Sequence, residues 1–417
     1  MTDTSYSYSY LMNETESLLT RMEQVKPFAM TMPMVKGASV SDEAFRAVNG
    51  LLEKGRSEIY DRIKTFSALL QKSSKDESTI RRLQKMFTVL KLRYNSILDQ
   101  LDIFADVFSQ RAEHDTGIWL SGLDVLAADG LSIGRPFFEI PPVMVFLERG
   151  HGAAIRRART RLPGGDENPA SVIQIPRERM VGSGIASSLI HEVGHQAAES
   201  LELTRQIRAE LNQRKASATK NQDAWRHYER WISEILADVW AMGHLGVTAT
   251  TGLMGVVTLP KYFQFRLDLE DPHPAPYIRV QLSCAFGKAL FPHPQWDKLS
   301  ALWDTFYATG ELPADKKQLL QQLKEEEDAF VQLVLQYQSP SLKGGSLKDI
   351  FPVNSRQPHQ LQQLYRHWIK DKSNINKAPP TLVFAVLGQA KHDYELDAVT
   401  ENHLLTQQLR SWAYNRK

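Results

Sequence analysis

Two short stretches of the chain carry the residues best suited to chemistry. The first reads His191-Glu-Val-Gly-His195, and the second, 39 residues past His195, reads Glu234-Ile-Leu-Ala-Asp238. Because positions i and i+4 share one face of a helix, His191 and His195 can both point a ring nitrogen at one metal ion. Glu192 lies between them, where it can reach a metal-bound water more easily than the metal. This arrangement predicts a zinc hydrolase.

A catalytic zinc ion needs three protein ligands and one position left open for water. We expect Glu234 to be the third ligand, with Asp238 or Glu229 as the alternatives. Asp238 lies one turn beyond Glu234, and a ligating imidazole usually donates its second N–H to a carboxylate or carbonyl. We therefore expect Asp238 to orient His191 or His195 from outside the ligand shell.

The residues around the motif favour a catalytic zinc over a structural one. We expect Gly194, the fourth residue of the motif, to leave space near the metal. A structural zinc would need four protein ligands, usually including cysteine. Cys284 is the only cysteine of the chain, and we expect it to be a small buried apolar side chain. An empty, degenerate site is the alternative.

The two motifs resemble those of the gluzincin metallopeptidases, in which two histidines and a glutamate bind zinc. The form Glu234-x-x-Ala-Asp238 is similar to that of the CAAX prenyl protease and heat-shock membrane protease group. His273-Pro274 followed by Arg279 resembles a downstream element of that group, which lies near the zinc. The matching pieces span about Ser171 to Leu282 and imply a zincin-like core. Members of that group are commonly embedded in membranes, unlike what we expect here.

The hydrolysis of a peptide bond assigns a role to several further residues. We expect Glu192 to be the general base that takes the proton of the attacking water. Negative charge on the scissile carbonyl oxygen needs a second donor besides the metal. His273 is the first candidate, with Arg279 and Tyr277 behind it and His293 further off.

The first three of these donor candidates also have a structural interpretation. His273 could be a turn residue of its proline-rich loop. Arg279 could anchor the loop through a salt bridge to Asp238 or Asp271. Tyr277 could belong to the apolar core. Two other histidines, His227 and His244, are expected to be structural.

Helices and a small sheet must position these residues. A helix is expected from Ser183 with a buried face recurring at helical spacing, a second from Ala224 to Met242, and a third over Leu245 to Thr258. Before them, three strands are expected. They cover Val143 to Leu147, Ala153 to Thr160 and Ser171 to Ile175, of which the last is our candidate edge strand for an extended peptide.

The N-terminal region predicts a helical hairpin. The first dozen residues look like a flexible leader because serine and tyrosine alternate there. A helix is expected from Ser41 to Gln71, and a heptad seam runs from Ile80 to Phe108 after the polar break at Lys72 to Ser78. Such a hairpin could bind a protein partner or a membrane surface, or pack as a layer on the rest of the protein.

Bulk composition narrows the class of protein. The 417 residues predict three parts: a helical hairpin over 1–112, a metallopeptidase core over 113–297 and a helical region over 298–417. The net charge of +2 argues against nucleic-acid binding. No signal peptide and no apolar run of about 18 residues is visible, so we expect a cytoplasmic protein without a membrane span.

The sequence therefore predicts a predominantly helical α+β protein with a zincin-like core. Its expected activity is hydrolysis of peptide bonds in a peptide or protein substrate, with Zn²⁺ as cofactor. The alternative is a non-catalytic helical scaffold that binds a partner and carries a structural or vestigial zinc site.

Overall fold

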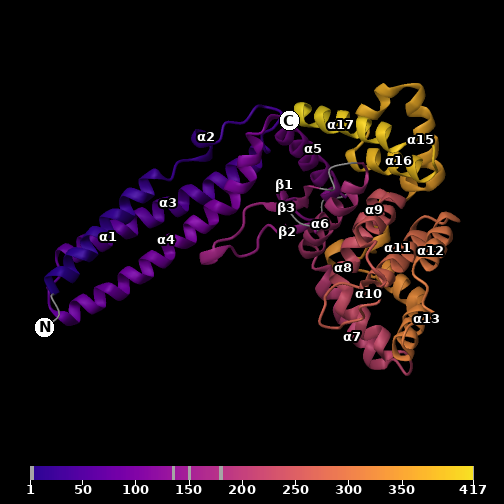
Figure 1. Ribbon diagram of the computed structural model, residues 1–417, viewed down its shortest axis with the longest axis horizontal. Coiled ribbons are helices and arrows are strands. Elements are labelled where there is room, and N and C mark those ends of the chain that lie inside the picture. The colour runs from indigo at the N-terminus through magenta and orange to yellow at the C-terminus, as the bar shows by residue number, and fades with distance from the viewer. Residues whose placement is uncertain (1–3, 134–136, 149–151, 178–181, 417) are drawn as a thin grey trace.

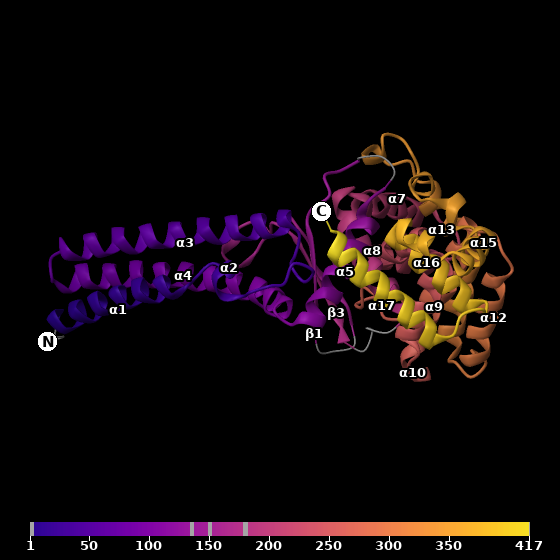
Figure 2. The ribbon, with the colours of Figure 1, turned by 90° about the horizontal axis from the view of Figure 1, so that it is seen from above.

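The computed structural model describes residues 4–133, 137–148, 152–177 and 182–416. A long helical arm projects from a larger, mainly helical body that holds a small sheet (Figure 1). The N-terminus lies at the free end of the arm, and the C-terminus lies where the arm joins the body (Figure 2). The expected class, a predominantly helical α+β fold with a small sheet, is confirmed.

Three long helices form the arm: α1 (Thr4–Gln24), α3 (Asp42–Gln71) and α4 (Glu77–Arg111), with the short α2 (Phe28–Thr31) between the first two. The expected hairpin of α3 and α4 is confirmed. The side chains of Ser41 and Asp76 cap the two helices by accepting hydrogen bonds from backbone N–H groups. The heptad seam of α4 is buried from Ile80 to Phe108 almost without interruption.

The expectation of a flexible leader was wrong, because the chain is helical from Thr4 onward. Helix α1 buries Leu11, Leu18 and Met22 at helical spacing against the hairpin. The alternating serines and tyrosines come before this apolar stripe, so their own sequence shows no helical periodicity from which the helix could be predicted. Once the buried turns have formed, each further residue extends the helix at low cost.

The sheet has three strands, β1 (Val143–Glu148), β2 (Ala154–Arg156) and β3 (Ser171–Pro176), in the order β1-β3-β2. Strand β3 pairs in parallel with β1 and antiparallel with β2. The expectation that Ser171 to Ile175 forms an edge strand was therefore wrong. A nearly continuous apolar run is typical of a strand covered on both sides, and β1 and β2 are the two edge strands.

Strand β2 is shorter than the expected Ala153 to Thr160. After Arg156 the chain leaves the sheet, and Arg159 adopts a positive φ of 65°. The side-chain amide of Asn168 donates to the carbonyls of Arg156 and Arg157, which holds the turn. The loop that follows contains the single-turn helix η1 (Pro163–Gly165).

The three helices expected around the motifs are present as α6 (Gly184–Ser200), α8 (Gln222–Leu245) and α9 (Val247–Val257), with α7 (Leu203–Ser217) after α6. Helix α5 (His114–Leu131) was not expected. It is buried along most of its length and apolar on nearly every side, so it lacks the one-sided periodicity that reveals a surface helix.

The rest of the body is helical, as expected. Its longer helices are α11 (Pro276–Leu290), α12 (Gln295–Phe306), α13 (Ala314–Gln336), α15 (Pro358–Lys370), α16 (Pro380–His392) and α17 (Ala398–Asn415), and its short ones are α10 (Lys261–Gln264), η3 (Pro340–Leu342), α14 (Leu347–Ile350), η4 (Val353–Arg356) and η5 (Lys372–Lys377). One apolar cluster extends from Trp119 to Trp412. The expected boundary after residue 297, between the core and the C-terminal helical region, stays a prediction.

Length and apolar composition together decide whether a helix can cross a bilayer. In the described ranges, no helix meets both requirements.

Candidate metal site

A close approach of α6 and α8 brings the two motifs together. A Cβ atom at Gly194 would lie 2.8 Å from the Cα of Ala237 and 2.8 Å from the Cβ of Trp240. Only glycine therefore lets the helices touch at this point. The expectation that Gly194 leaves space near a metal was wrong, because this residue faces α8.

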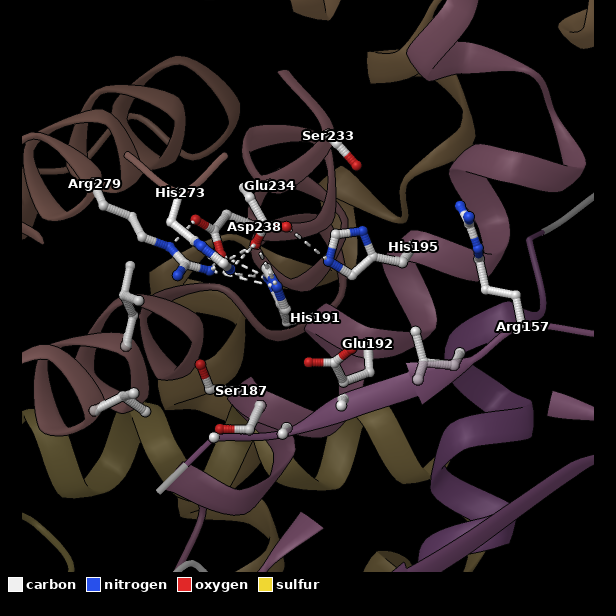
Figure 3. Close-up of a pocket in the computed structure, with 17 residues that line it drawn as sticks. Arg157, Ser187, His191, Glu192, His195, Ser233, Glu234, Asp238, His273 and Arg279 are labelled. Atoms are coloured by element: carbon white, nitrogen blue, oxygen red, sulfur yellow. Dashed lines mark hydrogen bonds and ion pairs between the residues drawn. The ribbon is translucent and has the colours of Figure 1, made fainter. Parts of the chain in front are cut away.

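Two imidazoles and one carboxylate converge across this contact. The Nε2 atom of His191 lies 3.3 Å from one Glu234 oxygen, and the Nε2 atom of His195 lies 3.4 Å from the other. One ligand atom from each of the three residues lies within 4.8 Å of the other two. Figure 3 shows these side chains pointing toward one another. The cluster could hold a divalent metal ion.

Asp238 and Arg279 lie behind the first histidine. An Asp238 oxygen is 2.8 Å from Nδ1 of His191. Arg279, on α11, donates to both Asp238 oxygens, from Nε at 2.7 Å and from Nη2 at 2.8 Å. The contact between Nδ1 and Asp238 orients the ring of His191 so that its Nε2 atom faces Glu234, with Nη2 of Arg279 at 3.4 Å. This is the contact expected for Asp238, and it is made to His191.

Burial is the largest single influence on the pKa values of Asp238, His191 and Glu234, but the charges and hydrogen bonds of their partners together outweigh it. Burial alone would raise the pKa of Asp238, but Arg279 and His191 lower it to about 2. Burial alone would lower the pKa of His191, but Asp238 and Glu234 raise it to about 9. Burial would also raise the pKa of Glu234, yet His191 and His195 hold it well below its usual range. Both carboxylates are therefore anionic at neutral pH.

The donor set fits a metal site on chemical grounds. Two imidazole nitrogens and a carboxylate oxygen are ligand types that zinc and related ions accept. Glu234 is only 9% exposed, and a buried carboxylate needs a cationic partner. His191 has its second nitrogen oriented by a carboxylate, as ligating histidines usually do. A cation between these three groups would satisfy all of them.

Glu192 lines the same cavity as the three candidate ligands. It is 6% exposed, and burial raises the pKa of its carboxyl group against the opposing effect of the two histidines. In Figure 3 its carboxylate faces the open space beside His191. A carboxylate with a raised pKa next to a candidate metal site is suited to accept and release a proton.

The cavity of about 470 Å³ extends from these residues to the edge strand. Its wall includes Ala154 and Ile155 of β2 on one side and Leu253 and Val256 of α9 on another. Arg157, which pairs with Glu199 at 2.9 Å, also lines the cavity. Sequence reasoning missed these wall residues, because nothing in their spacing links them to the histidines.

Of the three residues expected to donate a hydrogen bond to the substrate carbonyl, two line the cavity and one does not. His273 lines the cavity, its side chain is 55% exposed, and its Nε2 atom is 3.7 Å from Glu234. Its Nδ1 atom is 2.9 Å from Asp271. Arg279 also lines the cavity, and Asp238 accepts hydrogen bonds from its Nε and Nη2 atoms. Tyr277 does not line the cavity, and its hydroxyl donates to Asp304 at 2.6 Å.

The remaining candidates lie outside the cluster. His227 and His244 each hold a backbone carbonyl of their own helix through Nδ1, and both are buried. His293 is not among the residues that line the cavity. Glu229, an alternative third ligand, pairs with Arg208 at 3.2 Å instead.

The chain was compared with known proteins at three levels. Neither protein-family models, nor curated proteins, nor solved structures produced a match.

Proposed function

We propose that this protein is a zinc-dependent peptidase with a zincin-like core. The observation that carries the proposal is the convergence of His191, His195 and Glu234 in a cavity that Glu192 also lines. A structural metal site needs no such carboxylate and no adjoining cavity. A hydrolase needs both, because the base and the substrate must reach the same point.

Each residue of the cavity has a task in peptide hydrolysis. Zinc bound by the three ligands would act as a Lewis acid that lowers the pKa of water and polarises the scissile carbonyl. Glu192 takes a proton from the attacking water and passes it to the leaving amine nitrogen. His273 is exposed enough to donate a hydrogen bond to the carbonyl oxygen as negative charge builds there.

Arg279 has a different task in this proposal. Its hydrogen bonds to Asp238 hold that carboxylate against His191. It therefore acts as a positioning residue. This role agrees with the salt bridge to Asp238 that was one interpretation of Arg279 from the sequence. Tyr277 has no task, since its hydroxyl is engaged by Asp304.

A peptide suits the cavity better than a small compact substrate. The edge strand β2 forms part of the wall, and an edge strand can pair with an extended chain through main-chain hydrogen bonds. Such pairing would lay the substrate backbone alongside the three ligands. The edge-strand role that we had expected for Ser171 to Ile175 thus passes to β2.

The decisive test is Glu192→Gln in the zinc-loaded protein. We expect it to keep zinc and the fold but to lower the turnover of a peptide library by about 100-fold or more, because the proton acceptor is lost. Zinc content is measured by elemental analysis and cleavage by mass spectrometry. Glu210→Gln on α7, outside the cavity, is the control and should cleave like the unchanged protein.

Either of two results would count against the peptidase. Equal cleavage by the Glu192→Gln variant would show that another protein contaminates the assay or that the base is elsewhere. No cleavage of any library member by the zinc-loaded protein would favour the non-catalytic scaffold.

A further inference from the structure

A second cavity lies on the arm, near its free end and away from the metal cluster. It is a groove of about 700 Å³ between α1 and α4. Leu11, Ile80 and Phe87 lie in it and are buried, whereas Tyr10 and Leu92 are 55% and 61% exposed. Figures 1 and 2 show this end of the arm standing clear of the body. The groove therefore joins an apolar floor to a partly apolar rim.

The shape of the groove suits a helix. On α4 the lining residues recur every three or four positions, at Ile80, Gln84, Phe87, Lys91 and Asn95. On α1 the lining residues occupy two successive turns within 6–11. The groove thus runs along the two helices. A helix laid into it would turn the three-helix arm into a four-helix bundle.

Charge selects the kind of helix. Residues 78–98 of α4 contain five cationic residues and no Asp or Glu. Arg81 pairs with Glu77, and Arg93 pairs with Glu58. Arg82, Lys85 and Lys91 have no ion-pair partner in the described part of the chain. Exposed apolar side chains lie among them, and Val89 is 64% exposed.

We propose that this groove binds an acidic amphipathic helix of a partner protein. The apolar stripe of such a helix would cover the floor and Leu92, and its flanking carboxylates would meet Lys91 and Arg81. A concave groove favours a helix over a lipid surface, against which a convex apolar face packs better. The inference does not depend on the peptidase activity.

The test uses a synthetic amphipathic helical peptide that carries leucines on one face and glutamates on the other. A second peptide has the same sequence with lysine in place of each glutamate. Binding to the full-length protein is followed by fluorescence anisotropy. We expect the glutamate peptide to bind at least about tenfold more tightly than the lysine peptide and to weaken with added salt. Vesicles of anionic and of zwitterionic lipid are tested in parallel.

Two variants on the arm test whether the peptide binds in the groove, and two matched variants on the body are the controls. We expect Lys91→Glu and Leu92→Gln each to weaken binding of the glutamate peptide by about tenfold. Lys370→Glu and Ile369→Gln make the same chemical changes on exposed positions of α15 in the body. Both should bind like the unchanged protein.

The possible outcomes separate clearly. Equal binding of both peptides, no binding of either, or equal effects of the arm and body variants would overturn the proposal. Binding of anionic vesicles without binding of the glutamate peptide would overturn it as well and would assign the arm to a membrane surface.

Discussion

At the scale of single residues, the candidate site is a set of charges that balance one another. Glu234 is buried and faces two imidazoles, and Asp238 is half-buried and faces one imidazole and one guanidinium. Burial makes every member depend on its partners, because an unpaired charge inside a protein is costly. Removing one carboxylate therefore affects more than one contact.

Glu234→Ala tests the third ligand. We expect zinc affinity to fall by more than about 100-fold, since losing even a partner outside the ligand shell weakens metal binding about 10- to 100-fold. Metal titration with a chromophoric chelator measures the affinity. Glu229→Ala, which removes the alternative ligand, is the control and should bind zinc normally. If the two variants behaved in the opposite way, the third ligand would be Glu229.

His244 gives the protein a pH-dependent stability that is separate from the site. It is 2% exposed, and burial lowers the pKa of its imidazole to about 4. In the unfolded chain the His244 imidazole has the ordinary histidine pKa of about 6.5. Between these two values the unfolded state binds the extra proton, so the free energy of unfolding falls as the pH falls from about 6.5 to about 4, by about 3 kcal/mol in all.

His244→Phe should remove this pH dependence. The ring of His244 contacts the rings of Trp240 and Phe351, at centroid distances of 5.4 and 5.7 Å, so a phenyl ring at this position has aromatic neighbours. Urea unfolding at a series of pH values should show a flatter curve between pH 6.5 and 4 than the unchanged protein. His359→Phe changes an exposed histidine and should leave the slope as it was. An unaltered slope in His244→Phe would assign the acid sensitivity to other groups.

At the scale of the elements, the distance between α6 and α8 decides whether a site exists. Helix α6 supplies two candidate ligands, His191 and His195, and the proposed base Glu192, and α8 supplies Glu234 and Asp238. Neither helix could bind a metal alone with this geometry. Their contact at Gly194 sets the separation of the ligands, and a displacement of about 1 Å is enough to impair a catalytic arrangement.

Gly194→Ala should therefore weaken the site without touching a ligand. The added methyl group would lie 2.8 Å from the backbone of Ala237, so the helices must separate. We expect a loss of about 1–3 kcal/mol in the free energy of unfolding together with weaker zinc binding. Gly184→Ala on the same helix meets no atom within 4 Å and should change neither quantity. Normal zinc binding by Gly194→Ala would mean that the helix contact does not control the ligands.

At the scale of the whole molecule, one buried carboxylate ties the arm to the body. Asp124 on α5 accepts hydrogen bonds from Arg111 at the end of α4, from the backbone N–H of Val145 in β1, and from Arg416. Arg111 also donates to the carbonyl of Val145 at 2.6 Å. The arm, the sheet and the C-terminal segment thus meet at a single group.

Asp124→Asn should loosen this junction. Arg111 would keep a buried charge without its anion, and breaking a buried pair in this way costs about 3–5 kcal/mol. Urea unfolding measures the loss, and limited proteolysis should cut the arm–body junction faster. Asp115→Asn, on the same helix, changes only exposed pairs with Arg410 and His114 and should have little effect. Equal losses in both variants would show that the junction does not depend on Asp124.

The sequence by itself determined those features that depend on neighbours along the chain. The spacing of His191, Glu192 and His195 defined one helix face, and the three- and four-residue periodicity defined α3, α4 and α6. Such patterns arise from the geometry of the helix alone. They failed for α5, which is apolar on nearly every side, and for α1, whose apolar stripe begins only at Leu11.

Tertiary structure alone decided which distant groups meet. It selected Glu234 over Glu229 as the carboxylate between the imidazoles, paired Arg279 with Asp238, and made β2 rather than β3 the edge strand of the cavity wall. These outcomes depend on how helices and strands pack, as at Gly194, where the absence of one methyl group lets α8 approach. Packing contacts of this kind join residues that are far apart along the chain, and no local periodicity records them.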